Sequence, residues 1–364
     1  MKYFSFLLAI LFCSSRSKSL EEKCFIQENE NYFNGSEIEE PFNIEEIIKN
    51  KPDYLEITKL KKYRSFKIDS IESSNARYDL QKSERYLKDQ DSLYSDFDKN
   101  FFNQFEYSFK QISGNSKYAL GRNGLGFWLL EIKNEKASAY FLGLSFSHYY
   151  FNKIQGGPII QDGFLRLEGS LVKIVKVSGL PGYDDYSALD DGKLFKIKLE
   201  DLIKDSDQDG FNDIFENSFG LDPDKKDTDD DGIDDFHDHN PLFKSEKNKF
   251  TELYEVLISQ HLGIVKENLD KMSYFILPYE TDCDYFENID PDAKVLIMPT
   301  EKSKQPYYVQ VTDIFNDGYS KFKKDDKNPN LFYIHESGGG GIVDYSVEFK
   351  NEVWILKNVG GIVY

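Results

Sequence analysis

The chain is poor in cysteine, methionine and tryptophan, with only 3, 3 and 2 of these residues in a total of 364. It also lacks any excess of positive charge, because 45 Lys and Arg face 64 Asp and Glu and leave a formal net charge of -19. Nucleic-acid backbones and anionic membrane surfaces would be repelled, so we expect neither as a partner. The 40% of apolar residues nevertheless excludes a wholly disordered chain.

Long apolar runs are also absent, since no stretch reaches the roughly 20 residues that a transmembrane helix needs. A shorter run from Phe4 to Cys13 follows Lys2 and precedes several serines. This order is typical of a secretory signal peptide, so residues 1–19 predict a secreted, periplasmic or cell-envelope protein. The alternative is a lipoprotein anchored through Cys13, which fits less well because Phe12 stands where a small residue is wanted.

Removal of a signal peptide ending near residue 19 would leave two cysteines, Cys24 and Cys283. In an oxidising compartment these two residues can form a disulfide. They can equally remain free thiols, because two cysteines do not define a disulfide framework.

Two regions with strand and helix patterns flank an acidic segment. We predict an α+β, β-rich fold with two domains, residues 25–200 and 245–364, joined by residues 201–242. Alternating apolar residues predict strands at 127–133, 137–150, 164–177 and 193–199, and a C-terminal meander at 331–334, 343–349 and 353–356. Helical spacing appears at 42–51, 78–105 and 250–262.

The negative charge is concentrated in the acidic segment, which we define as residues 205–238. It holds thirteen Asp and one Glu against two Lys, and so carries -12 of the net charge. The simplest interpretation is that the segment forms a charged surface in contact with solvent. However, so few apolar residues cannot make such a segment collapse by themselves, and it would then need counter-ions to fold.

The spacing of the carboxylates indicates which ion. Calcium loops of the EF-hand type take ligands from positions 1, 3, 5, 7, 9 and 12 and place glycine at position 6. Residues 205–216 (the first loop) and 227–238 (the second loop) both follow this pattern, 22 residues apart. The predicted ligands are Asp205, Asp207, Asp209, Phe211 (backbone carbonyl), Asp213 and Glu216, and then Asp227, Asp229, Asp231, Ile233 (backbone carbonyl), Asp235 and Asp238. Such all-oxygen sets favour Ca²⁺ over Mg²⁺.

The stretch 205–241, with its DxDxDGxxD units and its closing Asp-x-Asn-Pro, resembles the thrombospondin type 3 repeats of bacterial envelope and secreted proteins. It lacks the cysteine pairs of the animal repeats and covers about a tenth of the chain. The resemblance implies structural calcium ions held in a compact spacer. EF-hand pairs and dockerins fit less well, because both place an aliphatic residue where Asn212 and Asp234 stand.

These observations predict a non-enzymatic calcium-binding protein whose repeats fix the arrangement of two interaction domains, with a cell-surface protein or glycan as a possible partner. A secreted hydrolase is the alternative, although its candidate carboxylates at 184–185 and 190–191 fall in an expected loop. A glycan-binding protein is the third interpretation, through exposed tyrosines. The candidates are Tyr149, Tyr150, Tyr183 and Tyr186.

Overall fold

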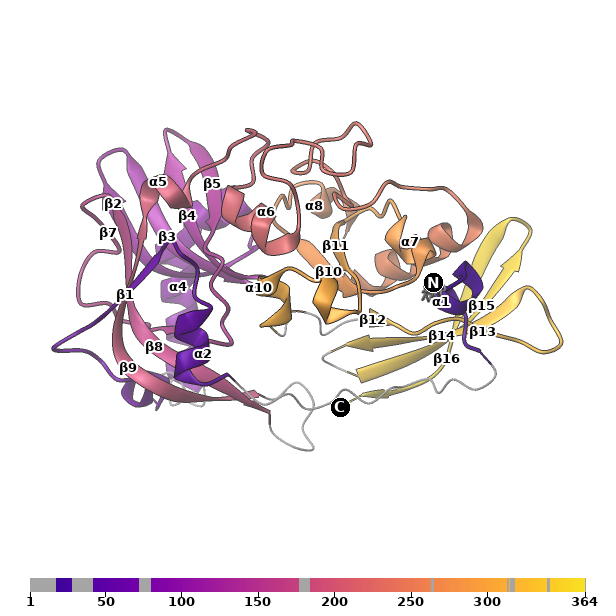
Figure 1. Cartoon of the computed structure of the whole chain (residues 1–364), viewed down its shortest axis with the longest axis horizontal. Coiled ribbons are helices and arrows are strands. Elements are labelled where there is room, and N and C mark those ends of the chain that lie inside the picture. The colour runs from indigo at the N-terminus through magenta and orange to yellow at the C-terminus, as the bar shows by residue number, and fades with distance from the viewer. Residues whose placement is uncertain are drawn as a thin grey trace, which may run out of the picture.

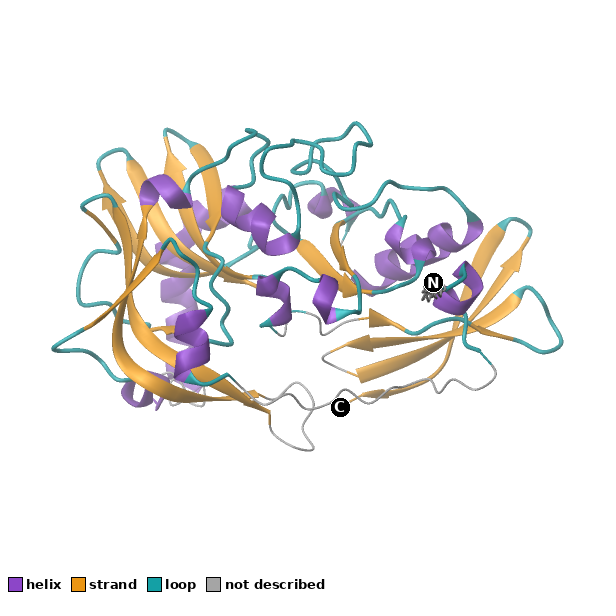
Figure 2. Cartoon of the chain, viewed as in Figure 1, coloured by secondary structure: helices purple, strands orange, loops and turns teal. Residues whose placement is uncertain are grey.

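A computed structural model describes residues 18–27, 42–71, 80–176, 184–262, 265–312, 314, 318–338 and 341–363. The structure is 24% helical and 36% strand, which confirms a sheet-rich chain with some helices (Figure 2). Cys13 and most of the predicted signal peptide lie outside the described residues. Within them, no helix combines the length and the apolar character needed to cross a bilayer.

The first half of the chain builds two antiparallel sheets. One is a meander of β2 (Glu106–Ser113), β3 (Ser116–Asn123), β4 (Gly126–Lys133) and β5 (Lys136–Phe141). The turn between β4 and β5 falls between the strands predicted at 127–133 and 137–150, and both Asn134 and Glu135 have positive φ angles, of 49° and 65°. Two left-handed residues are what a tight hairpin turn matched to the sheet twist requires.

The second sheet has the order β1-β9-β8-β6, with β7 paired to β8. Its strands are β1 (Leu55–Lys59), β6 (Tyr149–Phe151), β7 (Ile160–Gln161), β8 (Phe164–Lys176) and β9 (Asp184–Lys198). The helices of this half include α2 (Ile44–Lys49), α4 (Leu80–Phe101) and α5 (Leu199–Leu202) (Figure 1). The first two lie within the predicted helical stretches.

One expectation for this sheet is wrong. The carboxylate pairs at 184–185 and 190–191 lie within β9 and not in a loop. In the second pair the strand tolerates the charges because they find partners: Asp191 accepts hydrogen bonds from the Ser170 hydroxyl (2.6 Å) and the Phe66 backbone N–H (2.9 Å). Asp190 pairs with Lys193 at 2.6 Å.

The second half is smaller and mixed. Its sheet has the order β12-β14-β15-β16 and contains the predicted meander, with β13 paired to β14. Its strands are β12 (Gly318–Tyr319), β13 (Lys323–Lys324), β14 (Leu331–Gly338), β15 (Gly341–Lys350) and β16 (Val353–Val363). Beside it lie the parallel pair β10 (Ile276–Glu280) and β11 (Lys294–Met298) and the helices α7 (Lys249–Leu262), α8 (Lys266–Leu269), α9 (Asp284–Glu287) and α10 (Tyr307–Gln310).

Two buried clusters form the interior. The first core gathers side chains between Ile47 and Ile314 and includes five apolar residues of the acidic segment. The second core joins α7, α9 and the C-terminal sheet with Cys24 and Phe25 from the start of the described chain. Membership crosses the expected boundary at residue 245, because Leu296 and Tyr308 belong to the first core. The division into two domains therefore stays a prediction.

A disulfide attaches the N-terminal helix to the second core. Cys24, at the end of α1 (Leu20–Cys24), is bonded to Cys283, which precedes α9, across 259 residues of sequence. Both residues are buried. Of the two alternatives left by the sequence, the structure has the disulfide.

Candidate calcium site

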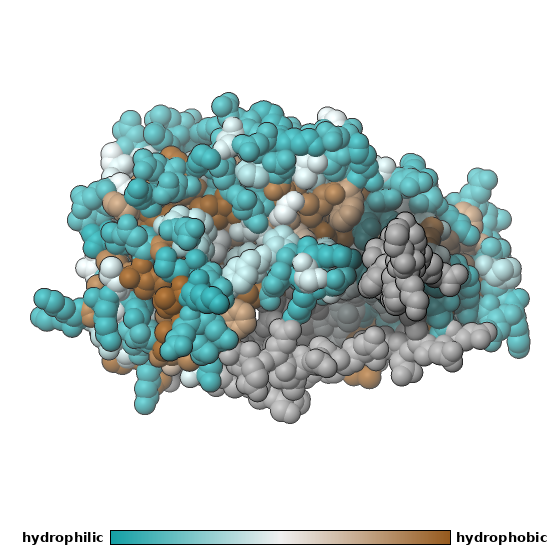
Figure 3. Space-filling view, in the orientation of Figure 1, coloured by the Kyte–Doolittle hydropathy of each residue, from teal (hydrophilic) through white to brown (hydrophobic). Residues whose placement is uncertain are grey.

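The acidic segment runs along the upper edge of the molecule in Figure 1, from the end of α5 past α6 (Asp213–Phe219) towards α7. Hydrophilic residues cover this edge in the space-filling view (Figure 3). Three of its aromatic residues point the other way: Phe211, Phe215 and Phe219 are at most 3% exposed and join the first core. The segment is thus anchored by aromatic side chains while its carboxylates gather above them.

The sequence repeat is also a repeat of hydrogen bonds. In the first loop, the N–H and hydroxyl of Ser206 donate to Asp213 at 2.8 and 2.9 Å. In the second loop, Thr228 donates to Asp235 in the same way at 2.8 and 2.6 Å. The Lys204 carbonyl accepts from the Asp213 N–H at 2.9 Å, and its counterpart 22 residues on makes the same bond at 2.7 Å.

The backbone of the two loops repeats as well. Position 4 is left-handed in both, with φ of 64° at Gln208 and 64° at Asp230. The glycines at position 6 also have positive φ, 126° at Gly210 and 105° at Gly232, where a residue with a Cβ would be strained. This shared path turns the carboxylates of each loop towards one point.

Three groups of carboxylate oxygens result. In each group, one oxygen from every member lies within 4.8 Å of the others, a spacing that could hold a metal ion. The groups are Asp205 with Asp207 and Asp209, then Asp209 with Glu216 and Asp235, and finally Asp227 with Asp229 and Asp231. Asp209 links the first two groups, so Asp235 of the second loop takes part in a site built mainly from the first.

The decisive feature is a set of buried oxygens without partners. Among the described residues, five buried carboxylate oxygens of the segment accept no hydrogen bond: Asp207 Oδ2, Asp209 Oδ2, both Oε atoms of Glu216, and Asp229 Oδ2. Glu216 is 0% exposed. A buried, unpaired carboxylate is strongly unfavourable, because it gives up water and gains nothing in return. A cation among these oxygens would remove the penalty, so the residues present fit a metal ion.

The pKa values follow the same geometry. Burial, together with the charges of Asp207 and Asp209, raises the pKa of Glu216 to about 9. Burial also raises the pKa of Asp235 to about 7 and that of Asp209 to about 6. Without a cation, these groups therefore retain protons at pH values where an ordinary carboxyl is ionised.

Other predicted ligands already have hydrogen-bond or ion-pair partners within the protein. Asp213 forms an ion pair with Lys204 at 2.5 Å in addition to its bonds from Ser206. Burial alone would raise the pKa of Asp213, but these partners outweigh it and hold the pKa below its usual range. In the second loop, Asp227 accepts backbone N–H groups of Asp231 (3.1 Å) and Gly232 (2.8 Å).

The position-12 residue of the second loop also has a partner, because the Asn240 N–H donates to Asp238 at 2.8 Å. Burial and the charges of Asp231 and Asp229 raise the pKa of Asp238 to about 6. At position 7, Phe211 is 3% exposed whereas Ile233 is 48% exposed. The second loop is therefore the more open and the better satisfied of the two.

Asparagines anchor the segment at both ends. The Asn212 side chain accepts from the Phe141 N–H (3.1 Å) and donates to the carbonyls of Phe141 (3.0 Å) and Leu202 (2.8 Å). Asn240 donates to the carbonyls of Glu287 (2.7 Å) and Ile289 (2.9 Å) beside the second core. Asn212 stands where an EF-hand has an aliphatic residue, and this exchange attaches the first loop to β5.

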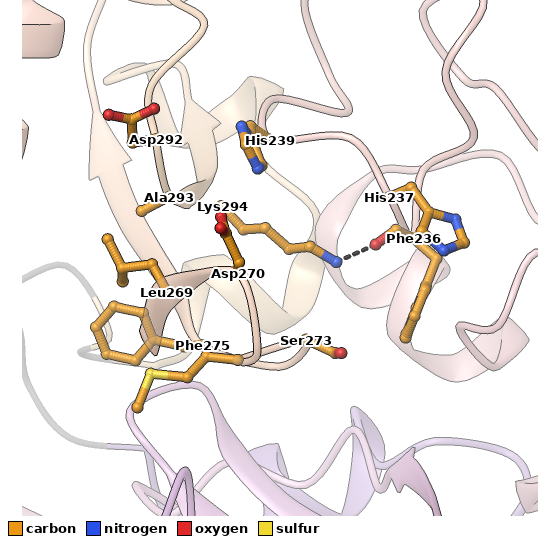
Figure 4. A pocket seen from close by; sticks show the side chains of 11 residues that line it. Phe236, His237, His239, Leu269, Asp270, Ser273, Phe275, Asp292, Ala293 and Lys294 are labelled. Carbon is orange, nitrogen blue, oxygen red and sulfur yellow. Dashed lines mark hydrogen bonds between the residues drawn. The ribbon is translucent and has the colours of Figure 1, made fainter. Parts of the chain in front are cut away.

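Lys294 contacts Phe236 of the acidic segment, and the sequence did not predict this contact. From β11 it donates to the Phe236 carbonyl, and its ammonium lies 4.4 Å from the Phe236 ring centroid and 5.6 Å from that of Phe211 (Figure 4). Burial lowers the pKa of Lys294 to about 8. No sequence pattern marks this lysine. By contrast, the repeated Lys-Asp-Ser/Thr-Asp at 204–207 and 226–229 was a readable signal for the Ser206 and Thr228 bonds.

Comparison with protein-family models, curated proteins and solved structures gives no match for this chain. The resemblance to thrombospondin type 3 repeats therefore depends on residue spacing alone.

Proposed function

We propose that residues 205–238 bind calcium and that the bound ions fix the arrangement of the first and second cores. The single observation that carries the proposal is the unpartnered, fully buried carboxylate of Glu216 beside Asp209 and Asp235. Hard oxygen donors of this number and charge suit Ca²⁺, which accepts six to eight oxygens in flexible geometry.

The anchoring contacts support an architectural role. The first loop is attached to β5 through Asn212, and the end of the second loop is attached beside α9 through Asn240. A cation shared by Asp209 and Asp235 would tie one loop to the other. The distance between the two anchors then depends on metal occupancy, as expected of a calcium-dependent spacer.

The compartment proposed is outside the cytoplasm: secreted, periplasmic or cell-envelope. The Cys24–Cys283 disulfide supports it, because structural disulfides persist in oxidising environments. Calcium also reaches about millimolar levels there, enough to fill modules with dissociation constants of about 10⁻⁴ to 10⁻³ M. A site at the tight end gains about 1.4 kcal/mol at 1 mM calcium.

Calorimetric titration of the metal-free chain with CaCl₂ tests the proposal, with limited proteolysis and small-angle scattering on the same samples. We expect saturable binding, protection of residues 205–240 from cleavage and a smaller radius of gyration. MgCl₂ should bind more weakly. If calcium leaves both the cleavage pattern and the radius unchanged, the architectural role is wrong.

A matched pair of variants locates the site. Asp235→Asn should weaken the tighter calcium site about tenfold, because this carboxylate approaches Asp209 and Glu216. Asp230→Asn removes the same charge from the same loop, but its carboxylate faces Lys225 at 2.8 Å. Asp230 also has positive φ, which asparagine adopts readily. Equal effects of the two substitutions would mean that only net charge matters.

A further inference from the structure

A second candidate site lies where α2, the stretch 143–149, α10 and α6 of the acidic segment meet. These elements surround a pocket of about 680 Å³, within the size range of small-molecule sites. Four tyrosines line it: Tyr54, Tyr149, Tyr307 and Tyr308. His148 is also part of the lining.

Two of the polar side chains that line this pocket lack hydrogen-bond partners. His148 is 9% exposed and Tyr149 is 4% exposed, and neither the imidazole nor the phenol hydroxyl forms a hydrogen bond with any residue that the structure describes. His148 makes only ring contacts there, with Phe42 at 5.1 Å and Tyr149 at 6.3 Å. Neither group is among the fully buried side-chain atoms that lack a partner, so the imidazole and the hydroxyl remain accessible at the pocket and are available to bond to a ligand there.

The remaining lining defines the chemistry of that ligand. The hydroxyls of Tyr54 and Tyr308 donate to the carbonyls of Leu142 (3.0 Å) and Leu125 (2.6 Å), so they are already engaged within the protein. Burial lowers the pKa of His148 to about 4, and its neutral ring offers one donor and one acceptor. Tyr307, 44% exposed, presents ring surface at the rim.

Charge at the pocket excludes anions. Asp53, Asp201 and Asp213 face a single cationic side chain, Lys204, which is already paired with Asp213 at 2.5 Å. Phosphorylated or carboxylated ligands would meet net negative charge. Aromatic surface combined with converging donors and acceptors instead matches a ring that carries hydroxyl groups and apolar C–H faces.

We propose that this pocket binds a short neutral saccharide, with Tyr149 and His148 as hydrogen-bonding groups and Tyr307 as the stacking surface. The sequence predicts exposed tyrosines, but Tyr149 is 4% exposed and belongs to the pocket lining, and the Tyr150 hydroxyl donates to Asp69 at 2.6 Å. Tyr183 and the side chain of Tyr186 lie outside the described residues. The ligand assignment does not rest on the calcium proposal, but Asp213 and Ser218 of the acidic segment line the pocket, so binding is tested with and without calcium.

The test is calorimetric titration of the full chain with maltotriose, cellotriose, mannotriose and triacetylchitotriose at up to about 10 mM, a range that detects weak sites. Spermidine and trigalacturonate serve as cationic and anionic probes. At least one neutral saccharide should bind, and the anion should not. Binding of the charged probes alone, or of none, overturns the proposal. Each titration is run in CaCl₂ and in EDTA. The saccharide result can then be interpreted even if the protein does not bind calcium.

The neighbouring residues Tyr149 and Tyr150 provide two variants with opposite expected effects on saccharide binding and on stability. Tyr149→Phe should weaken saccharide binding about tenfold, the loss of one hydrogen bond, and should not lower thermal stability, because the hydroxyl has no partner among the described residues. Tyr150→Phe should lower stability by removing the bond to Asp69 and leave binding unchanged. Tyr307→Ala, at an exposed position, should weaken binding about threefold. Wild-type affinity in both Tyr149→Phe and Tyr307→Ala would place binding elsewhere and overturn the assignment.

Discussion

The two loops of the acidic segment follow the same pattern over twelve positions but sit in different surroundings. The first is attached to the first core, and three of its carboxylates have buried, unpartnered oxygens. The second has one such oxygen, on Asp229. Backbone N–H groups already satisfy Asp227, and Asn240 satisfies one oxygen of Asp238. The same motif thus yields a site in need of a cation and a neighbour that is largely self-sufficient.

This difference teaches that ligand spacing alone does not set affinity. A loop that forms its own hydrogen bonds gains less when a metal arrives, since the metal replaces interactions already present. A loop whose carboxylates are buried and unpaired gains more. We therefore expect the first loop to bind calcium more tightly and the second to fill at higher concentration.

The largest contrast is expected at position 7, where both loops offer a backbone carbonyl. Phe211→Ala should lower the free energy of unfolding by about 3 to 5 kcal/mol, because the ring is 3% exposed and lies 4.1 Å from the Phe215 ring. Ile233→Ala should change it by less than about 0.5 kcal/mol, since Ile233 is 48% exposed. Urea unfolding in saturating calcium measures both. A large cost at Ile233 would contradict the peripheral position of the second loop.

The next contrast is at position 12. Glu216→Gln should weaken the tighter calcium site about a hundredfold, roughly 2.7 kcal/mol, while Asp238→Asn should affect only the weaker one. In EDTA at neutral pH, Glu216→Gln should instead raise the melting temperature, because it removes a buried carboxyl that has no partner among the described residues. Calorimetry and thermal melts measure the two effects. Loss of stability in EDTA would show that Glu216 is stabilising without a metal.

Much of the fold could be predicted from the sequence because its helices and strands depend on local, periodic patterns. The turn at Asn134 and Glu135, the C-terminal meander and α7 follow directly from alternation or helical spacing. The attachment of α1 to the second core did not, since it depends on a disulfide spanning 259 residues. The strand β9 was also missed in part, because its aspartates resemble a loop until their partners on other elements are known.

For the site, the spacing predicted which carboxylates would gather within each loop. It could not predict that Asp235 would approach Asp209 and Glu216, because that contact depends on how one repeat folds onto the other. Nor could it distinguish Asp213, which is engaged by Lys204 and Ser206, from Asp207 and Asp209, which each keep one buried oxygen without a partner. Tertiary packing, and not the motif, divides the predicted ligands into satisfied and unsatisfied groups.

The smallest expected effect is the dependence of stability on pH. In the metal-free protein, the raised pKa of Glu216, about 9, means that the folded state keeps a proton which the unfolded chain releases near pH 4.5. The folded state then binds more protons, so the free energy of unfolding falls as pH rises through this window. For one group the slope is about 1.4 kcal/mol per pH unit. Urea unfolding in EDTA between pH 7 and pH 8 measures it.

The comparison of the loops predicts which carboxyl carries that slope. Glu216→Gln should remove most of the slope, leaving the smaller contributions of Asp235, with a pKa of about 7, and Lys294, with a pKa of about 8, which have opposite signs. Asp238→Asn should leave the slope in place, because the pKa of Asp238 is raised only to about 6 and its titration is nearly complete by pH 7. Saturating calcium should also remove the slope, since ligation requires the ionised carboxylate and makes the folded state give up the same proton. A slope that survives Glu216→Gln unchanged would assign the trapped proton to another group and remove the main distinction drawn between the two loops.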